Sequence, residues 1–228
     1  AVVEGEPFVV VGVPAFNEER TIAKVVIEAQ EYADRVVVCD DGSTDMTAEV
    51  AERLGADVVR HECNLGKGAA LKSLFEAGRK IGADVFVTLD ADDQHDPEEI
   101  PKLVEPILRG EADVVIGNRF QLDDSVPAVR RWGNRVLNFL TNLSAGGAGD
   151  TQSGFRAYSR KALDAIDVID DGLGVDSQIF VDAKEKGLEV VEVPVSAKYP
   201  KDVRTSKKNT IQHGSEVILS LIELISER

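Results

Sequence analysis

Short apolar runs alternate with helically spaced apolar residues through the first half of the chain, and this rhythm constrains the fold more than any other feature. Each run has the length of a buried strand; the runs are 8–13, 35–39, 56–60, 84–89 and 113–116. Between them, apolar residues recur at the spacing of a helix face, as Ile22, Val25, Val26 and Ala29 do. Strands separated by helices predict an α/β fold with a mainly parallel central sheet flanked by helices.

The second half of the chain follows a looser pattern. Helices are expected at 130–143 and 176–186 and a strand at 188–195, whereas the polar segment 150–160 is expected to be irregular. A basic loop at 198–209 precedes a closing amphipathic helix at 211–228. The chain has 228 residues and shows neither an internal repeat nor a low-complexity linker, so a single domain over 1–228 is expected.

Charge and composition exclude several classes of protein. Acidic residues outnumber basic ones by 41 to 26, so a general nucleic-acid-binding surface is not expected. No apolar run approaches the roughly 18 residues needed to cross a bilayer, and the N-terminus has no signal-peptide pattern. Cys39 and Cys63 lack the spacing of metal ligands, which favours a reduced, intracellular protein.

The segment TLDADDQHDP, at 88–97, places four aspartates directly behind an apolar strand. Like charges this close together are unfavourable unless a cation neutralises them. Asp90 and Asp92 are two residues apart, so their side chains can lean the same way and hold Mg²⁺ or Mn²⁺. Gln94 could add a carbonyl oxygen. The plainer alternative is a solvated acidic turn.

Two neighbours of this pair are expected to have simpler roles. Asp96 precedes Pro97 and is expected to cap the helix that follows. His95 could ligate a metal, but a single histidine in a loop is more often solvated.

Two further polar segments follow strands and should lie at the same ligand-binding edge of the sheet. PAFNE, at 14–18, ends the first strand, and CDDGSTD, at 39–45, ends the second. A carboxylate here could accept hydrogen bonds from ribose hydroxyls or a base N–H. Helix capping by Asn17 and by the cluster at 43–45 is the alternative, and both interpretations can hold together.

The segment NLGKG, at 64–68, precedes a helix, where two glycines allow a ligand to approach the backbone and Lys67 can meet a phosphate or a base. It is not a Walker A loop, because no glycine stands five residues before Gly66. It also lacks the third glycine of a dinucleotide-binding fingerprint.

Taken in order, PAFNE, DDGSTD, NLGKG and DADDQHDP resemble the family 2 glycosyltransferases of GT-A fold. The later blocks are similar to those of the polyprenyl-phosphate branch, the dolichol-phosphate mannosyl- and glucosyltransferases. These blocks are GNRF at 117–120, RRWGNR at 130–135, DTQSGFRAYSR at 150–160 and EVPV at 192–195. The resemblance thus covers nearly the whole chain. It implies a nucleotide-sugar-binding half at 1–118 and an acceptor-binding half at 119–228.

The resemblance also implies roles for individual residues. Asp90, Asp92 and Gln94 are expected to hold the metal and the diphosphate, with Asp92 essential for catalysis. The other expected nucleotide-sugar contacts are Pro14, Phe16, Glu18, Asp41 and Lys67.

On the acceptor side, the resemblance implies that Arg119 and Arg131 face the acceptor phosphate and support catalysis. Ser153 is expected to contact the acceptor as well. Arg204 and Lys207 belong to a segment similar to the family's mobile acceptor-side loop. A threonine replaces the usual glycine there, which weakens that part of the match.

These expectations agree with the chemistry of sugar transfer. A divalent metal, Mg²⁺ or Mn²⁺, stabilises the departing diphosphate. An acceptor phosphate is already an anion, so it needs arginines to position it rather than a general base. A single displacement inverts the configuration at the anomeric carbon. The expected reaction moves glucose or mannose from a UDP- or GDP-sugar to a polyprenyl or dolichyl phosphate, with the protein peripheral at the cytoplasmic face of the membrane.

Two alternatives stay open from the sequence. A family 2 enzyme with a soluble or protein-linked acceptor would need a carboxylate base, for which Asp150 or Asp176 are candidates. A non-catalytic binding module, such as a receiver-like domain using Asp40 and Asp41, would be about half this length and would not need the segment 150–160.

Overall fold

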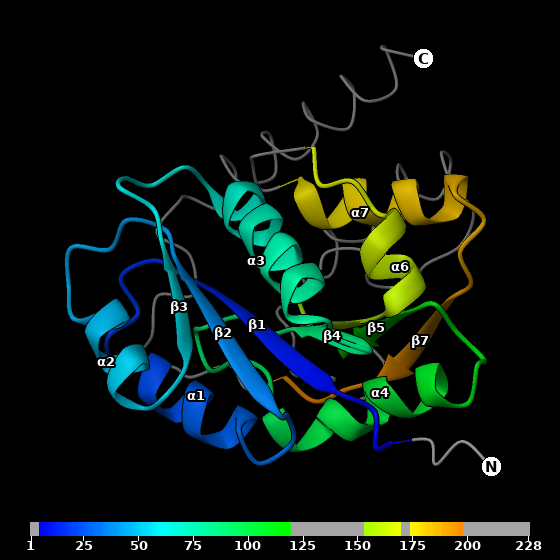
Figure 1. Ribbon diagram of the computed structural model, residues 1–228, viewed down its shortest axis with the longest axis horizontal. Helices are drawn as coiled ribbons and strands as arrows, with labels where there is room; N and C mark the ends of the chain where they lie inside the picture. The colour runs from blue at the N-terminus through cyan, green and yellow to red at the C-terminus, as the bar shows by residue number, and fades with distance from the viewer. Residues whose placement is uncertain (1–4, 120–152, 170–173, 198–228) are drawn as a thin grey trace, which may run out of the picture.

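A single twisted sheet runs through the part of the chain that the computed structural model describes, which is residues 5–119, 153–169 and 174–197. Its strands lie in the order β3-β2-β1-β4-β6-β5-β7 (Figure 1). They are β1 (Val9–Ala15), β2 (Arg35–Asp40), β3 (Asp57–Arg60), β4 (Val85–Thr88), β5 (Val114–Asn118), β6 (Arg156–Ser159) and β7 (Val190–Pro194). β1 pairs in parallel with β2 and β4, β2 with β3, and β5 with β7, so the predicted mainly parallel sheet is confirmed.

β6 is the exception to the parallel arrangement, and the sequence did not predict it. It lies antiparallel to both β4 and β5, within a segment that was expected to be irregular. Its four residues begin with Arg156, which is fully buried, whereas buried strands are usually continuous apolar runs. Helix α6 (Arg160–Ala165) follows it at once and was also missed.

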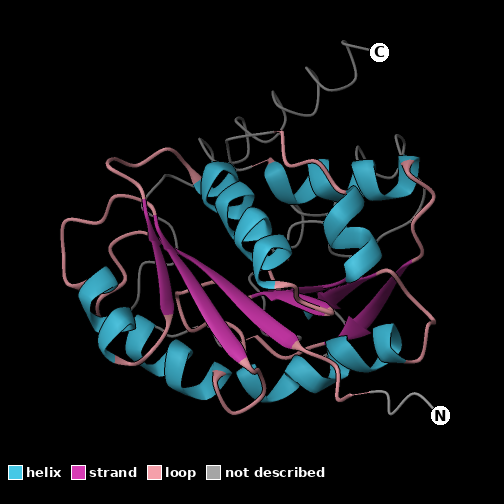
Figure 2. Cartoon of the chain, in the orientation of Figure 1, coloured by secondary structure: helices cyan, strands magenta, loops and turns pink. Residues whose placement is uncertain are grey.

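Helices cover both faces of the sheet (Figure 2). α1 (Ile22–Ala29), α2 (Thr47–Arg53) and α4 (Ile100–Leu108) pack on one face, and a 3₁₀ turn at Pro97–Glu99 leads into α4. α3 (Lys67–Ile81), α6 and α7 (Val175–Glu185) pack on the other. The result is a three-layer α/β arrangement.

Alternation along each central strand explains why both faces are buried. In β1, Val9, Val11 and Val13 belong to the core beneath α1 and α4, whereas Val10 belongs to the core beneath α3. Every second side chain points to the opposite face, so a strand covered on both sides must be apolar throughout. This is the physical reason that the strands of the first half stood out as continuous apolar runs.

The close packing of α3 on the sheet depends on two glycines. A Cβ at Gly12 of β1 would lie 2.5 Å from the ring of Phe86, and one at Gly78 of α3 would lie 2.7 Å from the same ring. The Phe86 ring therefore fills a slot that only glycines leave open. This contact helps to fix α3, whose first residue is Lys67.

The remaining predicted elements agree with the structure where it describes them. The helices and strands expected up to residue 116, and those at 176–186 and 188–195, are confirmed, with ends shifted by a few residues. The helices expected at 130–143 and 211–228 and the basic loop at 198–209 lie outside the described residues. Among the described helices, none combines the length and the apolarity needed to cross a membrane.

Candidate active site

The loops that carry the predicted site residues meet at one edge of the sheet. β1, β2 and β4 are parallel, so their carboxyl ends lie together, and the loops that follow them hold Glu18, Asp41 and Asp90. β6 is antiparallel and pairs Arg156 with Thr88, so the chain enters β6 at this same edge. The strand order reverses between β1 and β4, which is the position where α/β sheets bind ligands.

Asp90 and Asp92 form the acidic centre of this edge. Burial, and then the charge of Asp90, raises the pKa of Asp92 to about 6. Burial alone would raise the pKa of Asp90 too, but the charges of Lys67 and His95 hold it below its usual value. The two carboxylates therefore repel each other, and a bound divalent cation would offset this repulsion.

Lys67 provides positive charge beside this pair. Its Nζ lies 3.1 Å from Asp90 Oδ1 and 3.0 Å from Asp176 Oδ2. Asp176 belongs to the first turn of α7, and its side chain is only 7% exposed. Lys67 therefore joins the loop after β4 to α3 and α7. The sequence makes Asp176 a candidate base for a soluble or protein-linked acceptor, and the structure gives its carboxylate an ion-pair partner.

The backbone at Gly154 leaves the space that the Asp90 carboxylate occupies. A Cβ at this position would lie 2.7 Å from Asp90 Oδ1 and 2.8 Å from its Cγ. Thr88 Oγ1 donates to the Gly154 carbonyl at 2.8 Å, and Arg156 Nε donates to the Ser153 carbonyl at 2.7 Å. Since these bonds hold the backbone against β4, only glycine fits here while Asp90 keeps its position.

The residues present fit a hard divalent cation. Asp90 and Asp92 supply carboxylate oxygens, Gly154 leaves a cradle beside them, and their mutual repulsion favours a positive charge. Within the described residues, no cluster of three or more His, Cys, Asp or Glu side chains could enclose a metal. A metal bound to this pair would keep coordination positions for phosphate oxygens, as Mg²⁺ sites usually do.

The predictions for the neighbours of the acidic pair have different outcomes. Gln94 Nε2 donates to Asp92 Oδ2, so its predicted role as a metal ligand requires its carbonyl oxygen to turn inward, and that role stays a prediction. Asp96 accepts from Glu98 N and caps the 3₁₀ turn, as predicted. The expectation of a solvated His95 is wrong. Its ring is buried, lies 5.2 Å from that of Phe155, and places Nε2 at 3.9 Å from Asp90 Oδ2.

The loops after β1 and β2 hold each other in place. Ser43 Oγ accepts from Asn17 N at 2.8 Å, and Asn17 Oδ1 accepts from Thr44 N at 2.8 Å. Asp45 Oδ1 accepts from Thr47 N at 3.1 Å, which braces the turn that leads into α2. The N-cap positions are Thr21 for α1 and Met46 for α2, both without a side-chain cap hydrogen bond, so the expected helix capping by Asn17 and the 43–45 cluster is not observed.

The predicted nucleoside contacts lie around this junction. Pro14 is the penultimate residue of β1 and is half-buried, as are Phe16 and Glu18 in the loop that follows. After burial and Asp90, Glu18 also raises the pKa of Asp92, so its carboxylate lies near the acidic pair. Asp41 is buried, and both of its carboxylate oxygens accept hydrogen bonds from the protein. Their contacts with a nucleotide stay predictions.

The acceptor-side predictions are only partly within the described residues. Arg119 directly follows β5, and its charge contributes to the lowered pKa of Asp90, after burial, Lys67 and His95 have acted. Ser153 is fully buried and precedes Gly154. Arg131, Arg204 and Lys207 lie outside the described residues.

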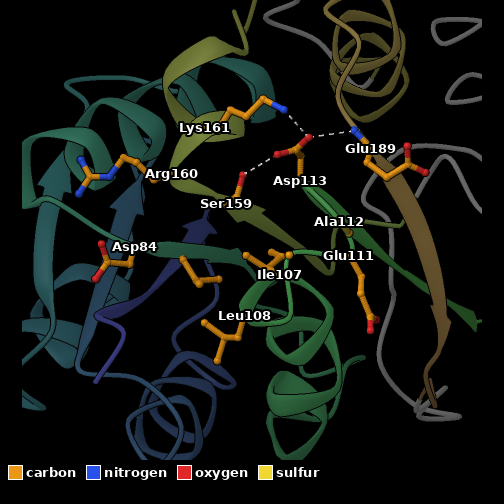
Figure 3. A pocket seen from close by; sticks show the side chains of 12 residues that line it. Asp84, Ile107, Leu108, Glu111, Ala112, Asp113, Ser159, Arg160, Lys161 and Glu189 are labelled. Carbon is orange, nitrogen blue, oxygen red and sulfur yellow. Dashed lines mark hydrogen bonds and ion pairs between the residues drawn. The ribbon is translucent and has the colours of Figure 1, made fainter. Parts of the chain in front are cut away.

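A hollow of about 520 Å³ lies at the opposite edge of the sheet and is not part of this site (Figure 3). Its wall includes Asp113, which precedes β5, and Ser159, which ends β6. Asp113 Oδ2 accepts from Lys161 Nζ at 2.8 Å and from Glu189 N at 3.0 Å. These charges are paired with one another, and the carboxyl ends of the parallel strands point away from them, so a structural role is the simplest account.

Sequence reasoning missed three contributors to the site. Gly154 and Arg156 lie in the segment expected to be irregular, and His61 follows β3 at the ligand-binding edge. Only the position of His61 after a strand was a usable signal. The roles of the other two depend on which backbone packs against Asp90.

Comparison with known proteins agrees with this arrangement. The model of the family described as "Glycosyl transferase family 2" matches residues 10–167. A UDP-N-acetylglucosamine–dolichyl-phosphate N-acetylglucosaminyltransferase of Methanococcus voltae is 30% identical, over 93% of this chain and 94% of that protein. A dolichyl-phosphate hexose transferase of Haloferax volcanii is 30% identical, over 93% of this chain and 91% of the relative.

A solved structure shares the fold. It is glucosyl-3-phosphoglycerate synthase from Mycobacterium tuberculosis in complex with Mn²⁺, UDP and glucosyl-3-phosphoglycerate. The TM-score is 0.73 at 25% sequence identity, and the match covers 96% of this chain and 80% of that one. The predicted GT-A fold is therefore confirmed, and the chain belongs to the family 2 glycosyltransferases.

Proposed function

We propose that this enzyme transfers a hexose, with inversion, from a UDP- or GDP-sugar to a polyprenyl or dolichyl phosphate. The proposal includes a Mg²⁺ or Mn²⁺ ion held by Asp90, Asp92 and Gln94. The observation that carries it is the pair of carboxylates, cradled by Gly154 and flanked by Lys67, at the edge where the strand order reverses. A donor diphosphate needs positive charge at this place and would share the metal with the pair.

The residues of the chain divide the work between them. A bound metal would act as a Lewis acid that stabilises the departing diphosphate. Lys67 lies beside Asp90 and would add a second positive charge toward the phosphates. Phe16, Glu18 and Asp41 would surround the nucleoside. Arg119, whose charge acts on Asp90, would orient the acceptor phosphate for in-line attack.

The choice of a phosphate acceptor has two supports. The names of the two relatives specify dolichyl phosphate. A phosphate monoester needs no general base. Of the two candidate bases for another kind of acceptor, the Asp176 carboxylate is already engaged with Lys67, and Asp150 lies outside the described residues. A lipid acceptor would place the enzyme peripherally at the cytoplasmic face of the membrane.

Transfer assays with matched acceptors test this proposal. The purified enzyme is given UDP-glucose, GDP-mannose or UDP-N-acetylglucosamine with Mn²⁺. The acceptor is a short-chain polyprenyl phosphate, 3-phosphoglycerate or the uncharged polyprenol. We expect transfer to the polyprenyl phosphate with at least one donor, and loss of transfer when EDTA is added. Transfer to 3-phosphoglycerate alone would show that the acceptor is a soluble molecule and would refute the lipid acceptor.

Arg119 provides the residue-level test of acceptor positioning. Arg119→Ala should raise the KM for polyprenyl phosphate about tenfold or more, with little change in the Kd for the nucleoside diphosphate. Arg109→Ala is the control, because Arg109 is exposed at the end of α4 and pairs with Glu105, one helical turn earlier. Equal defects in donor and acceptor binding would refute the assignment of Arg119.

A further inference from the structure

His61, which has no role in the proposed mechanism, lies at the centre of a hydrogen-bonded network. It follows β3, and its Nδ1 is 2.7 Å from Asp41 Oδ1, at the end of β2. On the other side of the ring, Nε2 is 2.9 Å from Ser73 Oγ, within α3. The ring thus connects two strands to the helix that begins with Lys67.

The chemistry of the partners fixes the orientation of the ring. An ionised Asp41 can only accept, so Nδ1 carries a proton and donates it. In the neutral ring Nε2 then accepts from the Ser73 hydroxyl, and it lies 3.6 Å from Cys39 Sγ. Burial raises the pKa of Cys39 to about 12, so this thiol stays protonated. Both ring nitrogens have a partner, and the imidazole cannot turn without losing one.

Asp41 also binds the loop that precedes α3. Its Oδ1 also accepts from Leu65 N at 3.0 Å, and its Oδ2 accepts from Gly66 N at 2.9 Å. The loops themselves touch, because a Cβ at Gly42 would lie 2.7 Å from Asn64 N. The carboxylate therefore holds two successive amides directly before Lys67.

Lys67 completes the chain of contacts through its ion pairs with Asp90 and Asp176. We propose that His61 is a positioning residue of the donor site. By donating from Nδ1 it orients Asp41, and Asp41 in turn holds the Leu65 and Gly66 amides so that Lys67 stays beside Asp90. The inference rests on the proposed function in one respect only, which is that Lys67 faces the donor diphosphate.

Two substitutions of His61 separate the two sides of the ring. His61→Asn places an amide N–H close to the position of Nδ1 and keeps the contact with Asp41. His61→Gln reaches instead toward the position of Nε2 and Ser73. The two variants have the same polar group, so a difference between them reports which nitrogen matters. We expect His61→Asn to keep the Kd for UDP or GDP with Mn²⁺ within about threefold, and His61→Gln to raise it about tenfold or more.

The steady-state kinetics should also be affected more in His61→Gln than in His61→Asn. His61→Gln should raise the donor KM more than it lowers kcat, because His61 acts on binding through Lys67. In the Lys67→Met background, His61→Gln should weaken the affinity for the nucleoside diphosphate no further, since the residue through which it acts is gone. Thermal unfolding of each variant identifies any general loss of structure.

Hydrogen exchange provides a measurement that does not depend on the donor. The peptide covering residues 62–69 should exchange at least tenfold faster in His61→Gln than in His61→Asn, because Asp41 is no longer oriented to accept from the Leu65 and Gly66 amides. Equal exchange and equal affinities in the two variants would overturn the role of His61. If the wild-type protein binds no nucleoside diphosphate but the two variants still differ in exchange, the proposed function is refuted while the positioning role of His61 stands.

Discussion

Gly154→Ala provides a sharp test of the acidic centre, because the structure specifies what the added methyl group would displace. The new Cβ would lie 2.7 Å from Asp90 Oδ1 and nearer still to Oδ2. Ordinary van der Waals contact begins at about 3.4 Å, so the carboxylate must retreat by at least about 0.7 Å. Metal–ligand distances tolerate only about 0.2 Å. Asp90 would then no longer share a cation with Asp92.

The expected loss can be estimated from this displacement. A misplacement on the order of 1 Å at a reacting centre can lower the rate about 100-fold. The cost in stability should be small, about 1 kcal/mol, because the Asp90 side chain is 28% exposed and can move toward solvent. For a chain of this size that corresponds to a fall in Tm of about 2–4 °C. The assay therefore compares Mn²⁺ affinity by calorimetry, the transfer rate and Tm.

The control is a double-mutant cycle with Asp90→Ala. If the methyl group acts by displacing the carboxylate, Gly154→Ala should lower Tm in the wild-type background and have almost no effect once that carboxylate is removed. The same fall in Tm in both backgrounds would mean that the clash is with the backbone instead. Unchanged Mn²⁺ affinity in the single variant would refute the reasoning about the cradle.

Two further predictions concern the charges at this centre. Burial and Asp90 raise the pKa of Asp92 from 3.8 to about 6, so the native state favours the protonated form and the metal-free protein loses stability as pH rises between these values. Asp92→Asn should therefore raise the Tm of the metal-free protein at pH 7 but not at pH 4; no gain at pH 7 would contradict the raised pKa. Lys67→Met removes the charge shared by Asp90 and Asp176, and should raise the donor Kd about tenfold or more. Lys72→Met, on an exposed position of the same helix, is its control, and an equal effect would point to a general loss of positive charge.

The outline of the fold was predictable because the strands of the first half are buried on both faces. Val10 and Val11 point to opposite sides of the sheet and are both fully buried, so the strand has no polar positions to obscure it. The edge on which Asp41 and Asp90 lie followed from the parallel order of their strands. β6 was missed because its buried face includes Arg156, whose hydrogen bonds to the Ser153 and Asp176 carbonyls replace apolar contacts. No local pattern predicts such an exchange.

The environments of individual side chains were less predictable. His95 looked like a loop residue open to solvent, but it is packed against Phe155, which lies 60 positions away in the sequence. Asp41 looked free to meet a ribose, but its oxygens accept from His61, Leu65 and Gly66. In both cases the partner comes from a separate strand or loop, so spacing along the chain contained no information about it.

The sequence by itself determined the α/β architecture and the edge of the sheet where the polar segments gather. Both depend on local periodicity and on the rule that parallel strands end on the same side. Only the tertiary structure decided that Lys67 joins Asp90 to Asp176, that Gly154 must lack a side chain, and that His61 supports Asp41. Those facts depend on contacts between segments far apart in the chain, and such contacts exist only after the helices and strands have packed.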